Sequence, residues 1–216
     1  PIITDACREL NFTNEIGYGG SIRLLKNIIG LWLVQECRRA WAAQGNEYSY
    51  ADLAEQAAAA EPYVSVLNPS EPRFLAPDDM PQRIADTCRE TGQPIPGTPG
   101  AVVRCALESL SLLYARTLRE SEKLVGWRAN TVHIVGGGSR NELLNQLTAD
   151  AANIRVVAGP AEATASGNIL VQAIAAGAVK DLAEARQIVR NSFDTKTFEP
   201  NPSEAIEAAR ARFDQL

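Results

Sequence analysis

The sequence predicts an α/β fold, on three observations. The last third of the chain alternates strand, helix, strand and helix, which is the order of an open sheet with helical crossovers. One apolar strand in that region runs directly into three consecutive glycines and then a helix. The longest periodic stretch, from Pro99 to about Val125, has apolar residues at the spacing of a buried helix.

Composition narrows the class of protein. The 216 residues suit one domain or slightly more, and 45% of them are hydrophobic. No stretch approaches the ~20 apolar residues of a membrane span, and the N-terminus has no signal-peptide pattern. The net charge of -5 includes no acidic or basic block, so we expect no nucleic-acid or membrane partner. The sequence therefore predicts a soluble, cytoplasmic protein.

The cysteines and the single histidine indicate structural roles. No C-x-x-C pair occurs, so the spacing favours reduced, buried thiols over a disulfide framework or a metal site. His133 lies within an apolar strand, and we expect a buried core imidazole there. The four cysteines are Cys7, Cys37, Cys88 and Cys105.

The first two thirds of the chain predict mainly helices. A short strand is expected at Glu9–Thr13, followed by a glycine-containing turn and a broad apolar helix from Ser21 to about Ala40. Residues 61–77 contain four prolines, which predict irregular structure. The apolar side chains of this segment are expected to be buried against other parts of the protein. Capping residues indicate three further helix starts, at Ser49, at Asp78 or Asp79, and at Thr98.

In the last third, strands are expected at 131–135 and 154–157, and helices at 141–151 and 163–176. Two more helices are predicted near the C-terminus, one opened by the capping box Asp181–Glu184 and one by the run Asn201–Glu204. Small residues line one face of the helix at 163–176. They favour close packing against a neighbouring element, and contact with a ligand is the alternative.

The glycine triplet Gly136–Gly138 is the most suggestive chemical feature. A glycine turn after a strand exposes backbone N–H groups and lets a ligand approach the main chain. Ligands of open α/β sheets bind at the carboxyl ends of strands, where this triplet falls. A tight structural turn is the alternative. A dinucleotide fingerprint is disfavoured because Asn141 replaces its third glycine and no acidic residue ends the next strand, and a P-loop is disfavoured because no Gly-Lys pair occurs.

Several runs of residues, taken together, resemble FGGY-family carbohydrate kinases. The runs 132–141, 143–150 and 159–165 resemble the adenosine-binding region of that family. Its C-terminal domain is matched further by the runs 12–15, 23–37, 77–81 and 88–93. These runs occur in the expected order and cover most of the chain, so they are far more specific than the glycine triplet.

This resemblance implies an actin-like ATPase fold, of the ribonuclease-H-like type. Residues 1–216 would form the single C-terminal, nucleotide-binding domain of a sugar kinase, with the first strands of that domain outside the chain. The implied substrates are ATP, with Mg²⁺, and a ketose, for which the resemblance favours L-rhamnulose. The implied partner is the N-terminal domain of the same polypeptide, which would carry the sugar pocket, the phosphate loop and the aspartate base.

On matching positions the resemblance places the nucleotide against Gly136, Gly137 and Gly138, with Asn141 nearby, and against Asn27 and Gln35. Asn27 and Gln35 stand eight positions apart, a little over two helical turns, so one predicted helix would present both on the same side. The alternative for these two is an ordinary polar network. No residue is assigned a catalytic role, and the chain alone is predicted to be inactive.

Three other functions stay open at this point. The first is kinase activity of the same family on another ketose. The second is a non-catalytic nucleotide-binding module of the same fold. The third, a nicotinamide-dependent oxidoreductase, is disfavoured by Asn141 and the missing acidic residue.

Overall fold

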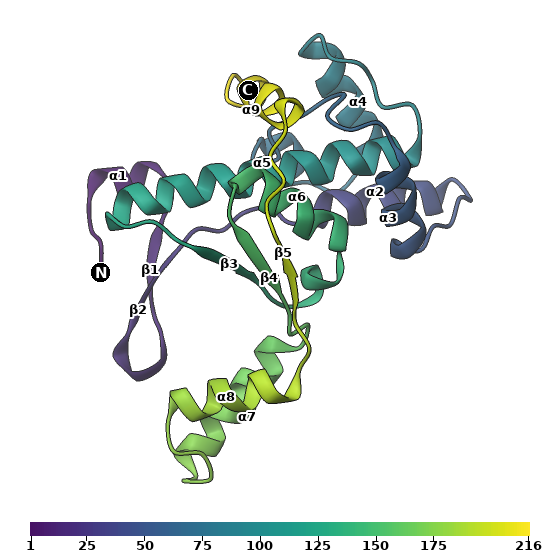
Figure 1. The fold of residues 1–216 in the computed structure, drawn as a ribbon. Coiled ribbons are helices and arrows are strands. Elements are labelled where there is room, and N and C mark those ends of the chain that lie inside the picture. Colours follow the sequence, from purple (N-terminus) through teal and green to yellow (C-terminus); the bar gives the residue numbers. More distant parts are fainter. The chain divides into compact units, whose positions relative to one another are not determined.

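The computed structural model describes residues 1–216. They form two compact units (Figure 1). Unit 1 comprises Pro1–Ala129 and Pro202–Leu216, and unit 2 comprises Asn130–Asn201. That residues 1–216 act as a single domain stays a prediction.

Unit 1 begins with a short helix and a β-hairpin. Helix α1 spans Asp5–Glu9, and strand β1 (Thr13–Ile16) pairs antiparallel with β2 (Ile22–Leu25). The loop between the strands is closed by a hydrogen bond of 2.7 Å from Gly17 N to Ser21 O. The N-terminal region is therefore organised by pairing between neighbouring segments.

Two predictions for this region are wrong. Residues Glu9–Thr13 contain the end of α1, a turn and only the first residue of β1. The helix expected over Ser21–Ala40 begins only at Trp32, because Ile22–Leu25 forms β2. The apolar spacing of this stretch fits a helix, but the hairpin partner fixes it as a strand. Tertiary pairing overrides a local pattern of this kind.

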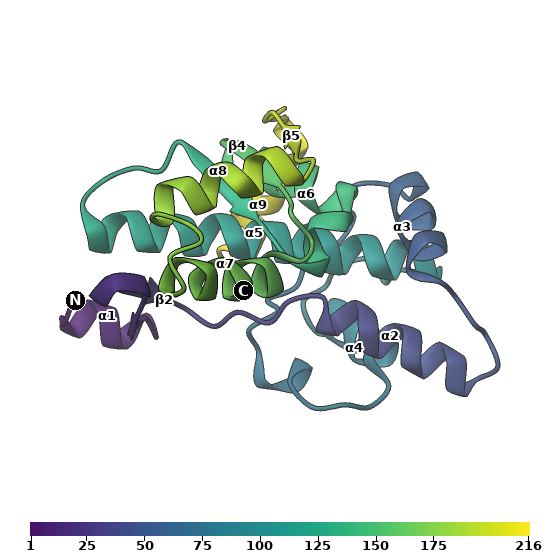
Figure 2. The same cartoon turned by 90° about the horizontal axis from the view of Figure 1, so that it is seen from below.

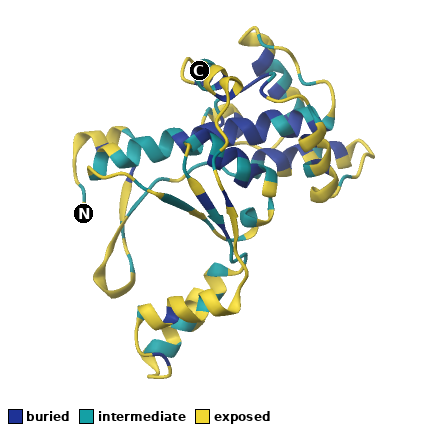
Figure 3. Ribbon diagram, viewed as in Figure 1, coloured by how far each residue is buried: buried dark blue, intermediate teal, exposed yellow.

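Five helices make up most of the rest of unit 1. They are α2 (Trp32–Ala43), α3 (Tyr50–Ala59), α4 (Met80–Glu90), α5 (Pro99–Val125) and α9 (Glu204–Phe213). The 27-residue α5 is the helix that connects the others in unit 1, since it packs against α3, α2 and α9. Its buried residues run from Gly100 to Ala115 (Figure 3), and α2 packs against α4 (Figure 2). No helix of the chain combines the length and apolar character needed to span a membrane.

Three helix starts in unit 1 confirm the predicted caps. Ser49, Asp79 and Thr98 each precede a helix and accept a hydrogen bond from a backbone N–H three residues on. The last helix starts two residues later than the run beginning at Asn201 predicts, because Ser203 is its N-cap. Asp52 completes a capping box with Ser49 at the start of α3. These side chains satisfy N–H groups that have no partner within the helix.

The irregular residues 61–77 are attached to the helices through a buried ion pair. Glu108 on α5 is 1% exposed and accepts hydrogen bonds from Tyr63 N at 2.8 Å and Arg104 Nε at 2.7 Å. Arg104 also donates to Ala57 O, at the end of α3, at 3.0 Å. Burial raises the pKa of Glu108, and the interaction with Arg104 opposes that change. The pair therefore joins α3, α5 and the irregular segment.

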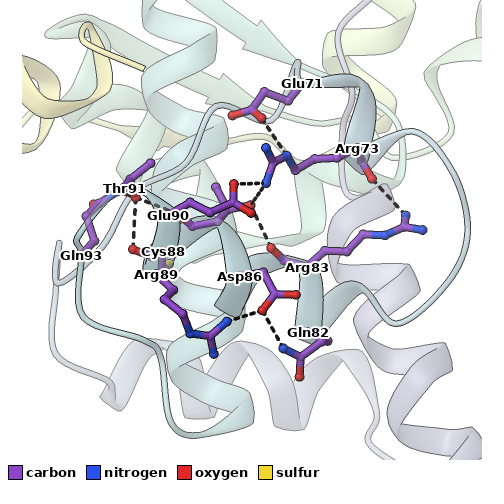
Figure 4. Close-up of polar contacts among 11 residues, drawn as sticks. Glu71, Arg73, Gln82, Arg83, Asp86, Cys88, Arg89, Glu90, Thr91 and Gln93 are labelled. Atoms are coloured by element: carbon purple, nitrogen blue, oxygen red, sulfur yellow. Dashed lines mark hydrogen bonds and ion pairs between the residues drawn. The ribbon is translucent and has the colours of Figure 1, made fainter.

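Two arginines hold the later part of this segment against α4 (Figure 4). Arg73 pairs with Glu90 on α4 at 2.6 Å and with Glu71 at 2.9 Å. Arg83 on α4 donates to the Arg73 carbonyl oxygen at 2.9 Å and pairs with Asp78 at 3.1 Å. Isolated surface pairs contribute little to stability, but shared partners fix the path of the loop.

All four cysteines are buried and none forms a disulfide, in agreement with their predicted structural role. Cys37 lies on α2. Burial raises the pKa of its thiol, and the nearby carboxylates of Asp79 and Glu36 raise it further. A thiol held in the protonated form is a poor nucleophile, so Cys37 acts through packing.

Unit 2 is a three-stranded sheet with three helices (Figures 1 and 2). Strand β3 (Thr131–Ile134) runs parallel to β4 (Arg155–Ala158), and β5 (Lys196–Phe198) is antiparallel to β4. The predicted order of strand, helix, strand and helix is confirmed. The helices are α6 (Glu142–Ala152), α7 (Ala163–Ala175) and α8 (Leu182–Ser192).

A small apolar core attaches α6 to the sheet. Ala149 of α6 packs with Val156 and Ala158 of β4 and Phe198 of β5, and the half-buried Val132 and Ile134 of β3 lie against them. Strand β5 was not predicted, because it is three residues long and only Phe198 marks it as apolar. Its place depends on the pairing of Phe198 with Val156.

The structure of unit 2 differs from two expectations. His133 is exposed, so the predicted core imidazole is wrong. Side chains alternate along a strand, and its neighbours Val132 and Ile134 occupy the core face. Helix α7 packs with α8 but has no buried residue, and a Cβ on Gly167 would meet nothing within 4 Å. The close packing expected of its small residues is absent from unit 2, so ligand contact stays open.

We predict that Gly100→Ala destabilises unit 1, because the backbones of α5 and α3 lie close together there. A Cβ on the buried Gly100 would lie 2.6 Å from the carbonyl oxygen of Gln56. The backbone of α3 would have to move, and overpacking of this kind lowers the free energy of unfolding by about 2 kcal/mol. Chemical denaturation followed by circular dichroism measures the change.

Gly97→Ala is the matched control for this prediction. Gly97 is exposed, and a Cβ there would meet no atom within 4 Å. Its substitution should alter the free energy of unfolding by less than about 0.5 kcal/mol. Equal stability of the two variants would contradict the close approach of α5 and α3.

Candidate nucleotide site

The candidate site in unit 2 is built on two loops that leave the same edge of the sheet. Because β3 and β4 are parallel, their carboxyl ends lie side by side. Gly159 N, after β4, donates to Ile134 O at 2.8 Å, and Gly136 N, after β3, donates to Pro160 O at 3.1 Å. The two loops therefore hold each other in place.

We call residues Gly136–Arg140 the glycine turn. Gly137–Arg140 form a single 3-10 turn that leads into α6. Gly136 has φ 79° and ψ -168°, a backbone conformation found essentially only in glycine. The first glycine of the triplet is thus required by the backbone itself.

Gly137 and Gly138 have no such requirement. Neither has a positive φ, and a Cβ on either would meet no atom within 4 Å. Their N–H groups donate no hydrogen bond within unit 2. The tight-turn explanation accounts for Gly136 but leaves these two glycines unexplained. Two unpaired backbone donors beside open space are suited to acceptor atoms of a ligand.

Asn141 is the N-cap of α6. Its side-chain Oδ1 accepts a hydrogen bond from Leu144 N at 2.9 Å, and its own N–H donates to Gly138 O at 3.1 Å. The side chain is half-buried and already engaged in the cap. Its predicted contact with a nucleotide stays a prediction, and the structure assigns it the additional task of fixing the glycine turn to α6.

Asn27 and Gln35 lie in unit 1, and the helical argument for them is wrong. Asn27 belongs to the irregular segment between β2 and α2, whereas Gln35 lies within α2. They do not share a helix face. Both side chains are exposed and form no hydrogen bond. Asn27 lines a hollow of about 490 Å³ with residues of α1 and β1. Nucleotide contact by either residue rests on the resemblance alone.

The sequence interpretation missed Ser139 and Asn145, which shape the turn. The Ser139 hydroxyl donates to Gly136 O at 2.7 Å, and Asn145 Nδ2 donates to Ser139 O at 2.8 Å. Asn145 is fully buried between Leu144 and Leu147, which are buried apolar residues of α6. A lone amide on the apolar stripe of a predicted helix was the available signal.

The charged side chains beside the glycine turn form exposed ion pairs, Arg140 with Glu162 and Glu142 with Lys196. Arg140 and Glu162 approach to 3.5 Å across the two loops, and both side chains are largely exposed. An exposed pair of this kind contributes little to stability. No group of three or more His, Cys, Asp or Glu side chains in the chain is arranged to hold a metal ion. The N–H groups of Gly137 and Gly138 are thus the donors of the glycine turn that have no acceptor within unit 2.

Comparison with known proteins identifies one family. Residues 1–176 match the model of the C-terminal domain of the FGGY family of carbohydrate kinases. A rhamnulokinase of Bacteroides thetaiotaomicron is 46% identical over 213 residues, which cover 99% of this chain and 43% of that protein. A rhamnulokinase of Bacillus subtilis is 48% identical over 200 residues, covering 93% of this chain and 41% of that protein. The chain thus spans less than half the length of these relatives.

The fold is also similar to that of a solved kinase. The crystal structure of xylulose kinase from Bifidobacterium adolescentis superposes with a TM-score of 0.52 and 18% sequence identity. The match covers 94% of this chain and 38% of the xylulose kinase chain. At this identity the similarity concerns the fold, and it confirms the predicted actin-like α/β class.

We predict that Gly136→Ala destabilises unit 2 while Gly137→Ala does not. Alanine at position 136 would be forced into a conformation reserved for glycine, at a cost of about 2 kcal/mol. Gly137 has an ordinary φ and open space around a Cβ, so its variant is the matched control. Amide hydrogen exchange of β3 and β4 measures the difference. Equal protection in both variants would show that the turn does not require the conformation of Gly136.

Proposed function

The chain belongs to the FGGY family of carbohydrate kinases, and from this premise we propose that it supplies the adenosine-binding half of an ATP-dependent ketose kinase. The observation that carries the proposal is the pair of open glycines, Gly137 and Gly138, with unpaired N–H groups. They lie at the carboxyl edge of parallel strands, where α/β proteins bind nucleotides. The N–H groups would donate to acceptor atoms of the adenosine part of ATP, with Gly136 and Asn141 fixing the turn.

We propose L-rhamnulose as the ketose, phosphorylated to L-rhamnulose 1-phosphate in rhamnose catabolism. Support comes from the names of the relatives, since proteins called rhamnulokinase are 46% and 48% identical to this chain. The residues that would contact the sugar belong to the part of those relatives that the chain does not cover. The choice of ketose therefore has no support from side chains in this structure.

The chemistry of phosphoryl transfer indicates which roles this chain would have and which the N-terminal part of the kinase would have. The reaction needs a positioned hydroxyl, an acceptor for its proton and positive charge on the phosphates. No catalytic residue is assigned in this chain, and no acidic cluster is arranged to hold Mg²⁺. Mg²⁺ would enter with ATP and neutralise charge on its phosphates. The N-terminal part of the full-length kinase, meaning a polypeptide of the relatives' length that carries this chain, would supply the rest.

The proposed substrates also imply the partners of the protein and its location in the cell. The predicted partners are ATP, the ketose and the N-terminal domain of the same polypeptide. A cytoplasmic location fits a kinase that draws on the cellular ATP pool. Contact of Asn27 and Gln35 with the nucleotide remains part of the proposal through family resemblance, and both side chains are exposed and unpaired as such contact requires.

We predict that Gly138→Val in the full-length kinase weakens ATP binding. The branched side chain would occupy the open space beside the two free N–H groups. The KM for ATP should rise about tenfold, which corresponds to about 1.4 kcal/mol. The KM for L-rhamnulose and the thermal stability should stay unchanged. Steady-state kinetics with Mg-ATP and L-rhamnulose measure these values.

Gly97→Val is the control, because Gly97 is an exposed glycine of unit 1 with open space around it. It should alter neither KM. A full-length kinase that binds no nucleotide in calorimetric titration would refute the proposed function. Unchanged kinetics in Gly138→Val would remove the glycine turn from the nucleotide site. Saturable binding of NAD in place of ATP would favour an oxidoreductase.

A further inference from the structure

Asn145 is a polar residue in a position that apolar residues normally occupy. It lies in α6 with no exposed surface, and its neighbours Leu144, Leu147 and Thr148 are buried as well. Burying an amide costs free energy unless its polar atoms are paired. Only one side of this amide is paired, since Oδ1 is buried and has no hydrogen-bond partner. Asn145 therefore does not satisfy the usual conditions for a stabilising core amide.

The paired side of the amide is directed at the glycine turn. Asn145 Nδ2 donates to the Ser139 carbonyl oxygen at 2.8 Å, six residues back along the chain. Ser139 in turn makes two hydrogen bonds to the Gly136 carbonyl oxygen, from its N–H at 3.0 Å and from its hydroxyl at 2.7 Å. A buried helix residue is thus linked through Ser139 to the first peptide group of the turn.

This link fixes the direction of a proposed ligand donor. The Gly136 carbonyl and the Gly137 N–H belong to one planar trans peptide group and point in opposite directions. Because Ser139 holds the carbonyl from one side, the Gly137 N–H is directed away from it, where it has no protein partner. A change in Ser139 would turn this peptide group and the donor with it.

We propose that Asn145 is a positioning residue of the nucleotide site, which acts through Ser139 to set the direction of the Gly137 N–H. This inference rests on the proposed function of the glycine turn. It explains why a fully buried amide is tolerated with one polar atom unpaired. Core stability alone gives no reason for an amide here, since an apolar side chain would avoid the unpaired Oδ1.

The test is Asn145→Leu in the full-length kinase. Leucine keeps the number and branching of the side-chain heavy atoms but removes the donor to Ser139 and the unpaired acceptor. We expect the KM for ATP to rise about fivefold or more, on the scale of one lost hydrogen bond. The KM for L-rhamnulose should stay within about twofold of the unmodified enzyme. The melting temperature should change little, because removal of the unpaired Oδ1 offsets the lost hydrogen bond to the Ser139 carbonyl oxygen.

Two further variants separate positioning from stability. Thr148→Val is the matched control, because Thr148 is a buried polar residue of α6 whose hydroxyl donates only to Leu144 O, at 2.7 Å. It should lower the melting temperature and leave the KM for ATP unchanged. Ser139→Ala removes the hydroxyl bond to Gly136 O from a half-buried position, and should raise the KM for ATP in the same direction by about twofold to threefold. Asn145→Ala removes the same donor to Ser139 and is measured in place of Asn145→Leu if that variant does not fold.

The outcomes distinguish this inference from the function on which it rests. If Gly138→Val raises the KM for ATP and the variants of Asn145 and Ser139 do not, the positioning role is refuted and the nucleotide site stands. If the KM values for ATP and L-rhamnulose rise together in Asn145→Leu, the residue acts on the fold in general and the inference is again wrong. If Gly138→Val leaves the KM for ATP unchanged, the proposed site and the positioning role both fail.

Discussion

Parallel pairing of β3 with β4 is the constraint on which the candidate site depends. The register aligns Ile134 with Ala158, so both strands end level and both following loops leave the sheet at one edge. Hydrogen bonds between the loops, from Gly136 to Pro160 and from Gly159 to Ile134, are possible only because the strands end together. An antiparallel pair would send these loops to opposite edges. The core between α6 and β4 stabilises this register from one face of the sheet.

The same constraint explains why the glycine turn can be open and still ordered. Three sets of hydrogen bonds hold its backbone. They come from the loop after β4, from the cap at Asn141 and from the side chain of Asn145, which donates to the Ser139 carbonyl oxygen. None of these contacts uses the N–H groups of Gly137 and Gly138. A site formed in this way has its donors in place before a ligand arrives, which reduces the entropic cost of binding.

Sequence patterns predicted the parts of this protein that local interactions determine. The capping box of Ser49 and Asp52, the start of α5 at Thr98 and the strand-helix order around Gly136 all follow from residues near one another in the chain. The failures involve distant partners. Residues 22–25 have apolar spacing that suits a helix, and only pairing with residues 13–16 makes them a strand. For the site, the triplet Gly136–Gly138 was visible in the sequence. The pairing of Asn145 with Ser139 was not, because it depends on how α6 leaves the turn.

Recognition through backbone groups, as proposed for the glycine turn, would separate affinity for ATP from the choice of sugar. Gly137 and Gly138 would contribute only backbone N–H groups and open space where other residues have a Cβ. Distinguishing one ketose from another requires side-chain donors and acceptors matched to individual hydroxyl groups, since a site discriminates strongly only where a missing partner leaves a buried polar group unpaired. A nucleotide site of this kind can therefore serve kinases that differ in their sugar. The glycine turn carries the physical argument for nucleotide binding, whereas the proposed specificity for L-rhamnulose derives from the relatives' names.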